Sequence, residues 1–191
     1  EHPRVGIISP KIYFYKGQEF HKDRYQARDL GRIIWYAGGI MDWQNVYAGH
    51  RGVDEIDRGQ YDRIMDTDFA TGCCMALNYN VIEKIGYFNE KYFLYFEDVE
   101  YSLLARKSGY KVIYFPETHL WHKNAVSSGK PGSNVHVYYQ TRNRLYFGYK
   151  FAGLRAKKSL FIDSLKLLAR GESYSRAVID YYLGRMGKTE I

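Results

Sequence analysis

The spacing of apolar residues changes once along this 191-residue chain, and that change limits the folds available to it. Up to residue 122, short apolar runs of strand length are mixed with helical segments, whereas from Val135 onward the apolar residues follow a helical spacing. Strands mixed with helices predict an α/β body, and the later pattern predicts a helical extension. We expect one part over residues 1–130 and the other over residues 131–191.

The expected strands are short and bounded by turn-forming residues. They cover residues 5–9, stopped by Pro10, with extended chain after it, then 32–37, 71–77, 111–115, stopped by Pro116, and 118–122. Among these, residues 71–77 are compact and apolar enough for a central strand. Residues 123–134, rich in glycine and serine, predict a loop.

Two helices are expected within the body. The first covers residues 80–85, with Asn80 as its N-cap and Gly86 as its stop. The second covers residues 98–108, because acidic residues crowd its start and Gly109 follows its end.

The net charge of +7 is concentrated at one end of the chain. Residues 142–191 hold 11 basic and 4 acidic side chains, whereas residues 1–141 hold 17 of each. A neutral body with a basic tail differs from a nucleic-acid-binding surface, so we expect no nucleic-acid partner. The tail is suited to an anionic membrane surface, although a solvated helical face has a similar composition.

The composition excludes an intrinsically disordered chain and a chain with a membrane-spanning helix. Apolar residues make up 46% of the chain, enough for a globular core, and no apolar run is long enough to predict a membrane-spanning helix. The only cysteines, Cys73 and Cys74, are adjacent, which makes them a poor disulfide pair. We expect them to be small buried residues in a reducing cytosol.

A run of aromatic residues leads directly into three carboxylates, Glu97, Asp98 and Glu100. A carboxylate in aromatic surroundings can serve as a general base when its pKa lies near the working range. Acidic residues at a helix start also cap the helix and complement its dipole, so the pattern alone leaves both interpretations open.

Two further groups carry residue types found at metal sites. His119 and His122 are three residues apart, so in an extended segment they face opposite sides and only one of them would serve a given metal ion. Asp66 and Asp68 match a two-carboxylate pattern that sugar-nucleotide enzymes use to hold a divalent ion, although so short a motif arises easily by chance.

Several segments occur in an order typical of one enzyme family. They are residues 6–12, 35–39, 71–77, 81–90, 93–100, 105–110, 116–117, 121–122 and 138–143. Together they resemble family 2 glycosyltransferases of the rhamnosyl- and galactofuranosyltransferase type. The resemblance implies the C-terminal, acceptor-side part of a GT-A-like (Rossmann-like) mixed sheet with flanking helices.

The resemblance also implies roles for individual residues. Asp98 matches the base that deprotonates an acceptor hydroxyl, which then attacks the donor's anomeric carbon with inversion. Glu97 would lie in the acceptor pocket or orient the base. His122 matches a ligand of the Mg²⁺ or Mn²⁺ ion that binds the donor diphosphate.

The remaining roles concern substrate binding. Arg142 matches an arginine that reaches the diphosphate. The residues expected to line the substrate site are Trp35, Gly38, Gly39, Gly72 and Trp121. The implied partners are a nucleotide-sugar donor and a glycan or lipid-linked acceptor of cell-envelope polysaccharide synthesis.

One departure from the family limits this interpretation. The family's nucleotide-binding part, which ends in the metal-binding carboxylates, precedes the strand that matches residues 5–9, and we find no counterpart of it. Asp66 and Asp68 follow that strand, so they cannot take its place. We therefore expect an acceptor-side fragment that is inactive alone, in the cytoplasm or peripheral at the inner face of the cytoplasmic membrane.

Two other functions remain open at this point. A basic, aromatic-rich module could bind glycans or surfaces without catalysis, and salt would then abolish binding while Asp98→Asn leaves it unchanged. A metal-dependent hydrolase using Asp98 and His122 would release free sugar without an acceptor, so an acceptor-stimulated rate would separate it from a transferase.

Overall fold

The computed structural model describes residues 4–123 and 132–191, and their contacts form two compact units. Unit 1 holds the described residues of 1–40, 49–87 and 101–124, and unit 2 holds those of 41–48, 88–100 and 125–191. The expected boundary at residues 130/131 lies outside the described residues. By their contacts, residues 41–48 and 88–100 group with the C-terminal helices.

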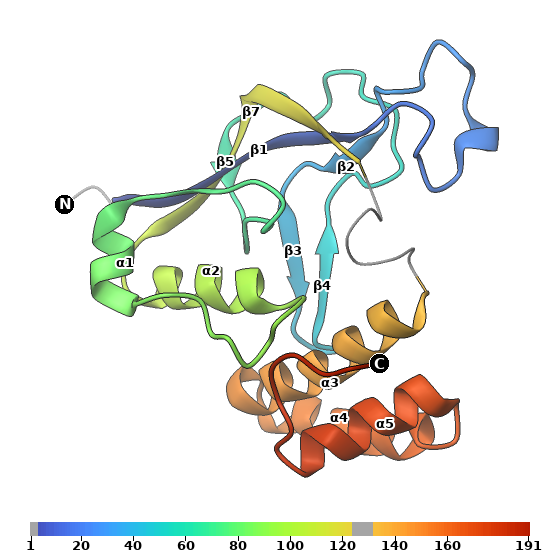
Figure 1. Cartoon of the computed structure of the whole chain (residues 1–191). Coiled ribbons are helices and arrows are strands. Elements are labelled where there is room, and N and C mark those ends of the chain that lie inside the picture. Colours follow the sequence, from blue (N-terminus) through green and yellow to red (C-terminus); the bar gives the residue numbers. More distant parts are fainter. Residues whose placement is uncertain (1–3, 124–131) are drawn as a thin grey trace. The chain divides into compact units, whose positions relative to one another are not determined.

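The sheet of unit 1 is built around two long parallel strands, β1 (Val5–Phe14) and β7 (Lys111–His122), which run side by side in Figure 1. Three short strands pair antiparallel with them: β2 (Ile34–Tyr36) and β6 (Ala76–Leu77) with β1, and β5 (Met65–Asp66) with β7. The expected α/β body with a mixed sheet is confirmed.

Two prolines that were expected to end strands lie inside them. Pro10 pairs with Phe115, and the next residue of β1, Lys11, pairs with His119. The register therefore shifts beside Pro116, and such an irregularity accommodates a residue that lacks an N–H donor. The expected breaks at residues 10 and 116 are wrong for this reason.

The expected central strand over residues 71–77 is also wrong, since only its last two residues form β6. Thr71 to Cys74 forms a turn, in which the Cys74 amide donates to the Thr71 carbonyl at 3.2 Å. The turn leaves Cys73 exposed and Cys74 half-buried, so the expected burial of the two cysteines is wrong as well.

Helix α1 (Tyr79–Ile85) starts one residue earlier than expected, because Asn78 rather than Asn80 is its N-cap and accepts a hydrogen bond from the Asn80 amide. Helix α2 (Glu97–Lys107) agrees with the expectation to within one residue at each end. The core of unit 1 joins sheet and helices through these buried residues: Ile7, Ala70, Val81, Tyr101, Ala105 and Val112.

Three smaller elements complete the part before the C-terminal helices. A short 3₁₀ helix, η1 (Lys22–Arg24), lies in the segment between β1 and β2. Strands β3 (Gly39–Asp42) and β4 (Tyr47–His50) form a separate two-stranded sheet.

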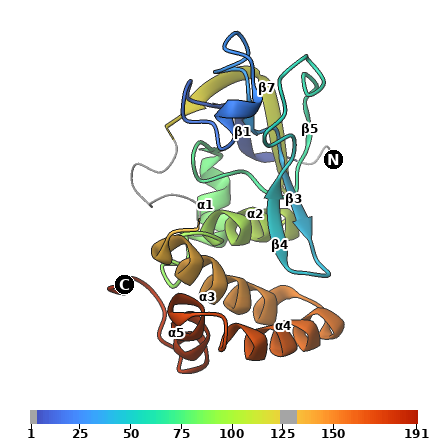
Figure 2. The ribbon, with the colours of Figure 1, turned by 90° about the vertical axis from the view of Figure 1, so that its right-hand side faces the viewer.

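Unit 2 contains the helices α3 (Asn134–Phe151), α4 (Leu154–Leu167) and α5 (Glu172–Tyr182), which pack together in Figure 2. Tyr138 and Tyr139 of α3 are buried with Ala177 of α5. The expected helical extension is confirmed. Most of the loop expected over residues 123–134 lies outside the described residues. In the described parts of the chain, no helix is both long and apolar enough to cross a membrane.

Candidate functional site

The loop that leads into Glu97 has an unusual backbone. Phe93, Tyr95 and Phe96 have φ angles of 61°, 67° and 72°, in the left-handed region that bulky residues rarely occupy. Each such residue costs on the order of 1 kcal/mol or more, so the surrounding structure must hold the loop in place. Backbone strain of this kind concentrates at functional sites, which makes the loop a candidate for function.

Helix α3 supplies the contacts that hold this loop. The side-chain amide of Asn143 donates to the carbonyl oxygens of Tyr92, Leu94 and Tyr95 at 2.9, 2.6 and 3.0 Å. Asn143 itself is fully buried. Within unit 2, one amide therefore contacts three carbonyl oxygens of the four-residue segment 92–95, directly before the acidic start of α2.

The three carboxylates at that start have different surroundings. Glu100 is buried and bound by Lys150 at 2.8 Å, by Asn89 and by the Tyr92 hydroxyl, so its role is structural. One oxygen of Asp98 accepts a 2.8 Å hydrogen bond from the Val99 amide.

Glu97 differs from both of its acidic neighbours. Its Oε2 atom is buried and makes no hydrogen bond to any described residue. Burial, together with the negative charge of Asp98, raises the pKa of Glu97 to about 8. At neutral pH Glu97 is therefore mostly protonated, and a buried carboxyl group with a raised pKa is typical of acid–base sites.

A cavity of about 750 Å³ in unit 2, the Glu97 pocket, lies against this carboxyl group. Phe93 and Lys91 line it on the loop side, and the C-terminal residues Met186 and Lys188 line it from the other. The Lys188 ammonium lies 5.8 Å from the centroid of the Phe93 ring. Aromatic side chains, carboxyl groups and ammonium groups line the pocket together, which suits a polar ligand with several hydroxyl groups.

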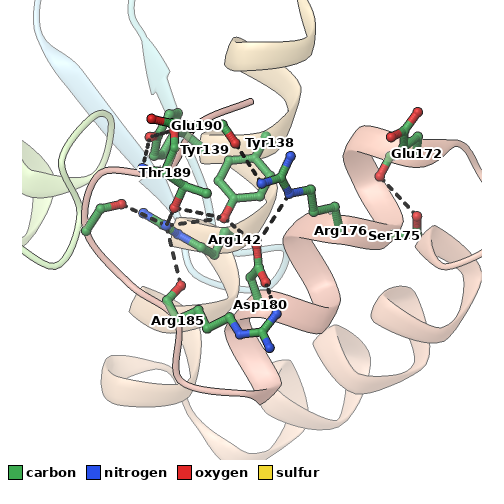
Figure 3. Close-up of polar contacts among 11 residues, drawn as sticks. Tyr138, Tyr139, Arg142, Glu172, Ser175, Arg176, Asp180, Arg185, Thr189 and Glu190 are labelled. Atoms are coloured by element: carbon green, nitrogen blue, oxygen red, sulfur yellow. Dashed lines mark hydrogen bonds and ion pairs between the residues drawn. The ribbon is translucent and has the colours of Figure 1, made fainter.

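Arg142 lies in the protein interior rather than in a pocket. Its guanidinium is fully buried and donates to the carbonyls of Tyr92 at 3.1 Å and Gly187 at 2.9 Å (Figure 3). It also lies 4.9 Å from the Tyr139 ring centroid. In this structure Arg142 joins the loop before α2 to the C-terminal segment, and its expected contact with a diphosphate stays a prediction.

The same figure shows how that segment is held on α5. The buried carboxylate of Asp180 accepts from the Tyr138 hydroxyl at 2.8 Å and pairs with Arg185 at 3.3 Å and Arg176 at 3.8 Å. The Thr189 amide donates to the Tyr139 hydroxyl at 2.9 Å. The chain after α5 is therefore part of the folded unit that contains the Glu97 pocket.

Unit 1 contains the other predicted site residues, and an aromatic cluster forms around Trp35. The ring centroid of Trp35 lies 4.5 Å from that of His122 and 4.4 Å from that of His50. His50 also places Nδ1 3.1 Å from the Trp35 carbonyl oxygen. Trp35 and His122 are thus brought together as expected of residues that share a site.

Burial keeps both imidazoles of this cluster neutral. It lowers the pKa of His50 to about 4 and lowers the pKa of His122 below its usual value. The buried Nδ1 of His122 makes no hydrogen bond to any described residue. A neutral imidazole with an unsatisfied nitrogen is suited to ligate a metal ion, so His122 fits the role that the resemblance implies.

The remaining ligands of such an ion are not assembled here. Across residues 4–123 and 132–191, no group of three or more His, Cys, Asp or Glu side chains could hold a metal. Asp66 and Asp68 lie instead near Lys111 and Arg106, at 3.8 and 3.7 Å. The metal ion therefore stays a prediction that rests on His122 alone.

Gly38 and Gly39 are buried and serve packing. Gly38 has a φ of 111°, and a Cβ at Gly39 would lie 2.5 Å from the Phe69 ring. The Gly39 amide donates to Thr67 Oγ1 at 2.6 Å. Their expected contact with a sugar stays a prediction.

The last two predicted site residues are Trp121 and Gly72. Trp121 is half-exposed, packs on Tyr13 and His119, and donates to the Gly31 carbonyl at 2.8 Å. Gly72 is exposed in the turn that precedes β6. Their roles as substrate contacts stay predictions.

Sequence reasoning missed two residues that shape these sites, His50 and Asn143. His50 reaches Trp35 only through the pairing of distant segments, so no local pattern marks it. Asn143 lies in a segment that carries the family resemblance, but its role depends on packing against a loop about 50 residues earlier.

Comparisons with known proteins agree with a sugar-transferring class. No protein-family model matches the chain. The low-salt glycan biosynthesis hexosyltransferase Agl10 of Haloferax volcanii is 31% identical over 86 residues, which cover 45% of this chain and 28% of that protein.

A second relative covers more of the chain. The N-acetylglucosaminyl-diphospho-decaprenol L-rhamnosyltransferase of Mycobacterium tuberculosis is 29% identical over 150 residues, 73% of this chain and 44% of that protein. The chain spans less than half the length of either relative. The similarity is distant and partial homology to glycosyltransferases.

Proposed function

We propose that this chain is the acceptor-side part of an inverting glycosyltransferase of family 2, which transfers a sugar from a nucleotide-sugar donor to a glycan or lipid-linked acceptor in cell-envelope polysaccharide synthesis. The observation that carries the proposal is the pair Glu97 and Asp98. The two residues follow a strained loop, the pKa of Glu97 is raised to about 8, and Glu97 lines a pocket of ligand size.

In this proposal Asp98 is the general base. Its carboxylate removes the proton from the acceptor hydroxyl as that oxygen attacks the anomeric carbon, and general-base assistance of this kind accelerates reactions about 10²–10⁴-fold. Glu97, neutral at pH 7, donates a hydrogen bond to another acceptor oxygen in the Glu97 pocket. The proposed division of roles gives Glu97 the proton and Asp98 the negative charge that a base needs.

The donor side of the reaction involves unit 1. His122 would hold a Mg²⁺ or Mn²⁺ ion through its unsatisfied nitrogen, and the Trp35 ring packs against that imidazole at a tilt of 58°. Bound there, the ion would stabilise the charge of the leaving diphosphate. We propose that its carboxylate ligands lie outside these 191 residues, and that the chain alone is inactive, since it spans less than half of the matched relatives.

The test is Mn²⁺-dependent transfer from a panel of nucleotide sugars to lipid-linked acceptors, measured for this chain and for a longer polypeptide of the relatives' length. Asp98→Asn should lower the transfer rate at least about 100-fold. Glu83→Gln, which changes an exposed carboxylate on α1 in the same manner, is the matched control and should leave the rate unchanged.

Two results would contradict the proposal. If Asp98→Asn keeps the wild-type transfer rate, Asp98 is not the base. If nucleotide sugar is consumed at the same rate with and without acceptor, the enzyme is a hydrolase. Activity of the 191-residue chain alone would contradict only the part of the proposal that concerns missing ligands.

A further inference from the structure

Helix α4 has two apolar faces, and only one of them is buried in unit 2. The buried face comprises Ala156, Leu160 and Leu167, with Ser164 between them. The other face comprises Leu154, Phe161 and Leu165, and it continues into the C-cap residue Leu168, which keeps a helical backbone. The four residues are spaced by seven, four and three positions and therefore form one stripe. We call these four residues the α4 stripe.

The α4 stripe is exposed over its whole length. Leu154 is 86% exposed, Phe161 49%, Leu165 53% and Leu168 42%. Single exposed apolar side chains are common on protein surfaces, but four of them in one continuous row are not. A row of this kind is typical of a helix whose second face meets an apolar partner.

Positive charge borders the stripe on both sides. Lys157 and Lys158 precede Phe161 by four and three residues, so helical geometry places one lysine at each edge of the stripe. Arg155 and Lys166 lie further around the same helix. Its only acidic residue, Asp163, is already paired with Arg144 at 2.7 Å.

We propose that the α4 stripe docks on a membrane surface that contains anionic lipid, with α4 lying in the plane of the interface. The four apolar side chains would enter the boundary between headgroups and acyl chains, while Lys157 and Lys158 reach the lipid phosphates. This combination of an apolar row with lysines at its edges favours a lipid surface over a second copy of the chain. A second copy would bring like charges together along the same row.

The inference goes beyond the proposed function and does not depend on it, because it rests on α4 alone. The test is co-sedimentation of the protein with lipid vesicles. One set of vesicles consists of phosphatidylcholine alone, and the other contains about 30% phosphatidylglycerol in addition. The wild-type chain should bind the anionic vesicles and be released by high salt, since the lysine contribution is screened.

Two pairs of substitutions separate the apolar and the charged contributions. Phe161→Ser with Leu165→Ser should weaken binding about tenfold or more. Lys157→Gln with Lys158→Gln should also weaken binding about tenfold or more. All four side chains are at least partly exposed, so these variants should keep the wild-type circular dichroism spectrum and melting temperature.

Matched substitutions on α1 and η1 serve as controls. Tyr79→Ser removes an aromatic side chain that is 68% exposed, and Lys22→Gln with Lys84→Gln removes two exposed charges elsewhere. These variants should bind vesicles like the wild type, apart from the small loss that follows from net charge.

The proposal is overturned if the wild-type chain does not bind anionic vesicles, or if the stripe variants bind as well as the controls. Analytical ultracentrifugation provides a further check. A dimer that dissociates in the Phe161→Ser, Leu165→Ser variant, without any vesicle binding, would show that a second copy covers this face instead.

Discussion

The side-chain amide of Asn143 donates a 2.6 Å hydrogen bond to the carbonyl oxygen of Leu94. Leu94 lies between Phe93 and Tyr95, both of which have positive φ angles. The same amide also donates to the carbonyls of Tyr92 and Tyr95, so a single buried residue of α3 supports the backbone that leads into Glu97 and Asp98.

Asn143→Ala should therefore destabilise the protein strongly. The substitution removes the donor to the Leu94 and Tyr95 carbonyl oxygens and leaves the Tyr92 carbonyl to Arg142, so the strained loop loses much of its support. We expect the free energy of unfolding to fall by about 2–4 kcal/mol. Urea unfolding measures this. Asn80→Ala, at an exposed position of α1, is the control and should change the free energy by less than about 0.5 kcal/mol.

The raised pKa of Glu97 predicts a pH-dependent stability. Above its unfolded pKa of about 4.5, Glu97 ionises in the unfolded chain but keeps its proton in the folded protein until about pH 8. The folded state then binds more protons than the unfolded state, so the free energy of unfolding falls as pH rises, by up to about 1.4 kcal/mol per pH unit.

Glu97→Gln removes this group and should flatten that slope. Relative to the variant, the wild-type protein should be of similar stability near pH 4, should lose stability between about pH 4.5 and 8, and should lose no more above that range. Urea unfolding of both proteins from pH 4 to pH 9 tests this. Parallel curves for the two proteins would show that Glu97 has an ordinary pKa.

The C-terminal segment should depend on Arg142. Arg142→Met keeps the size of the side chain but removes the donors to the Tyr92 and Gly187 carbonyls. We expect trypsin to cleave after Arg185 and Lys188 at least about tenfold faster, because the segment is no longer held. Arg170→Met, at an exposed position, is the control, and equal cleavage rates in both variants would contradict this role.

Gly39 should tolerate no side chain. A Cβ there would lie 2.5 Å from the Phe69 ring, so Gly39→Ala should lower the free energy of unfolding by about 1–3 kcal/mol. At Gly153 nothing lies within 4 Å and φ is −71°, so Gly153→Ala should change stability by less than about 0.5 kcal/mol. Thermal unfolding of the two variants provides the comparison.

His122 should control the response to a divalent ion in any form of the protein that transfers sugar. His122→Ala should raise the Mn²⁺ concentration for half-maximal rate about tenfold or more, because an uncharged nitrogen ligand is lost. His119→Ala, which removes an exposed imidazole from the other face of β7, should leave that concentration unchanged. Equal effects of both substitutions would remove His122 from the metal site.

Local signals in the sequence were sufficient for several elements. The bounds of α2 follow from acidic residues at its start and from Gly109, which has a φ of 89° directly after its end. The helical extension follows in the same way from the spacing of its apolar residues. Such signals involve residues within one or two helical turns of each other, so they can be recognised in the sequence without knowledge of the rest of the fold.

The ends of the strands and the burial of individual groups depend on the tertiary structure. Pro10 stays inside β1 because the register shift beside it removes the need for a donor, which depends on a partner strand about 100 residues away. Glu97 was a candidate in the sequence, but only packing leaves its Oε2 atom buried without a partner. The sequence by itself determined the helices and the residue types available for chemistry. The tertiary structure decided which of those residues meet and which lose water, because desolvation and long-range contacts depend on segments that are distant in the chain.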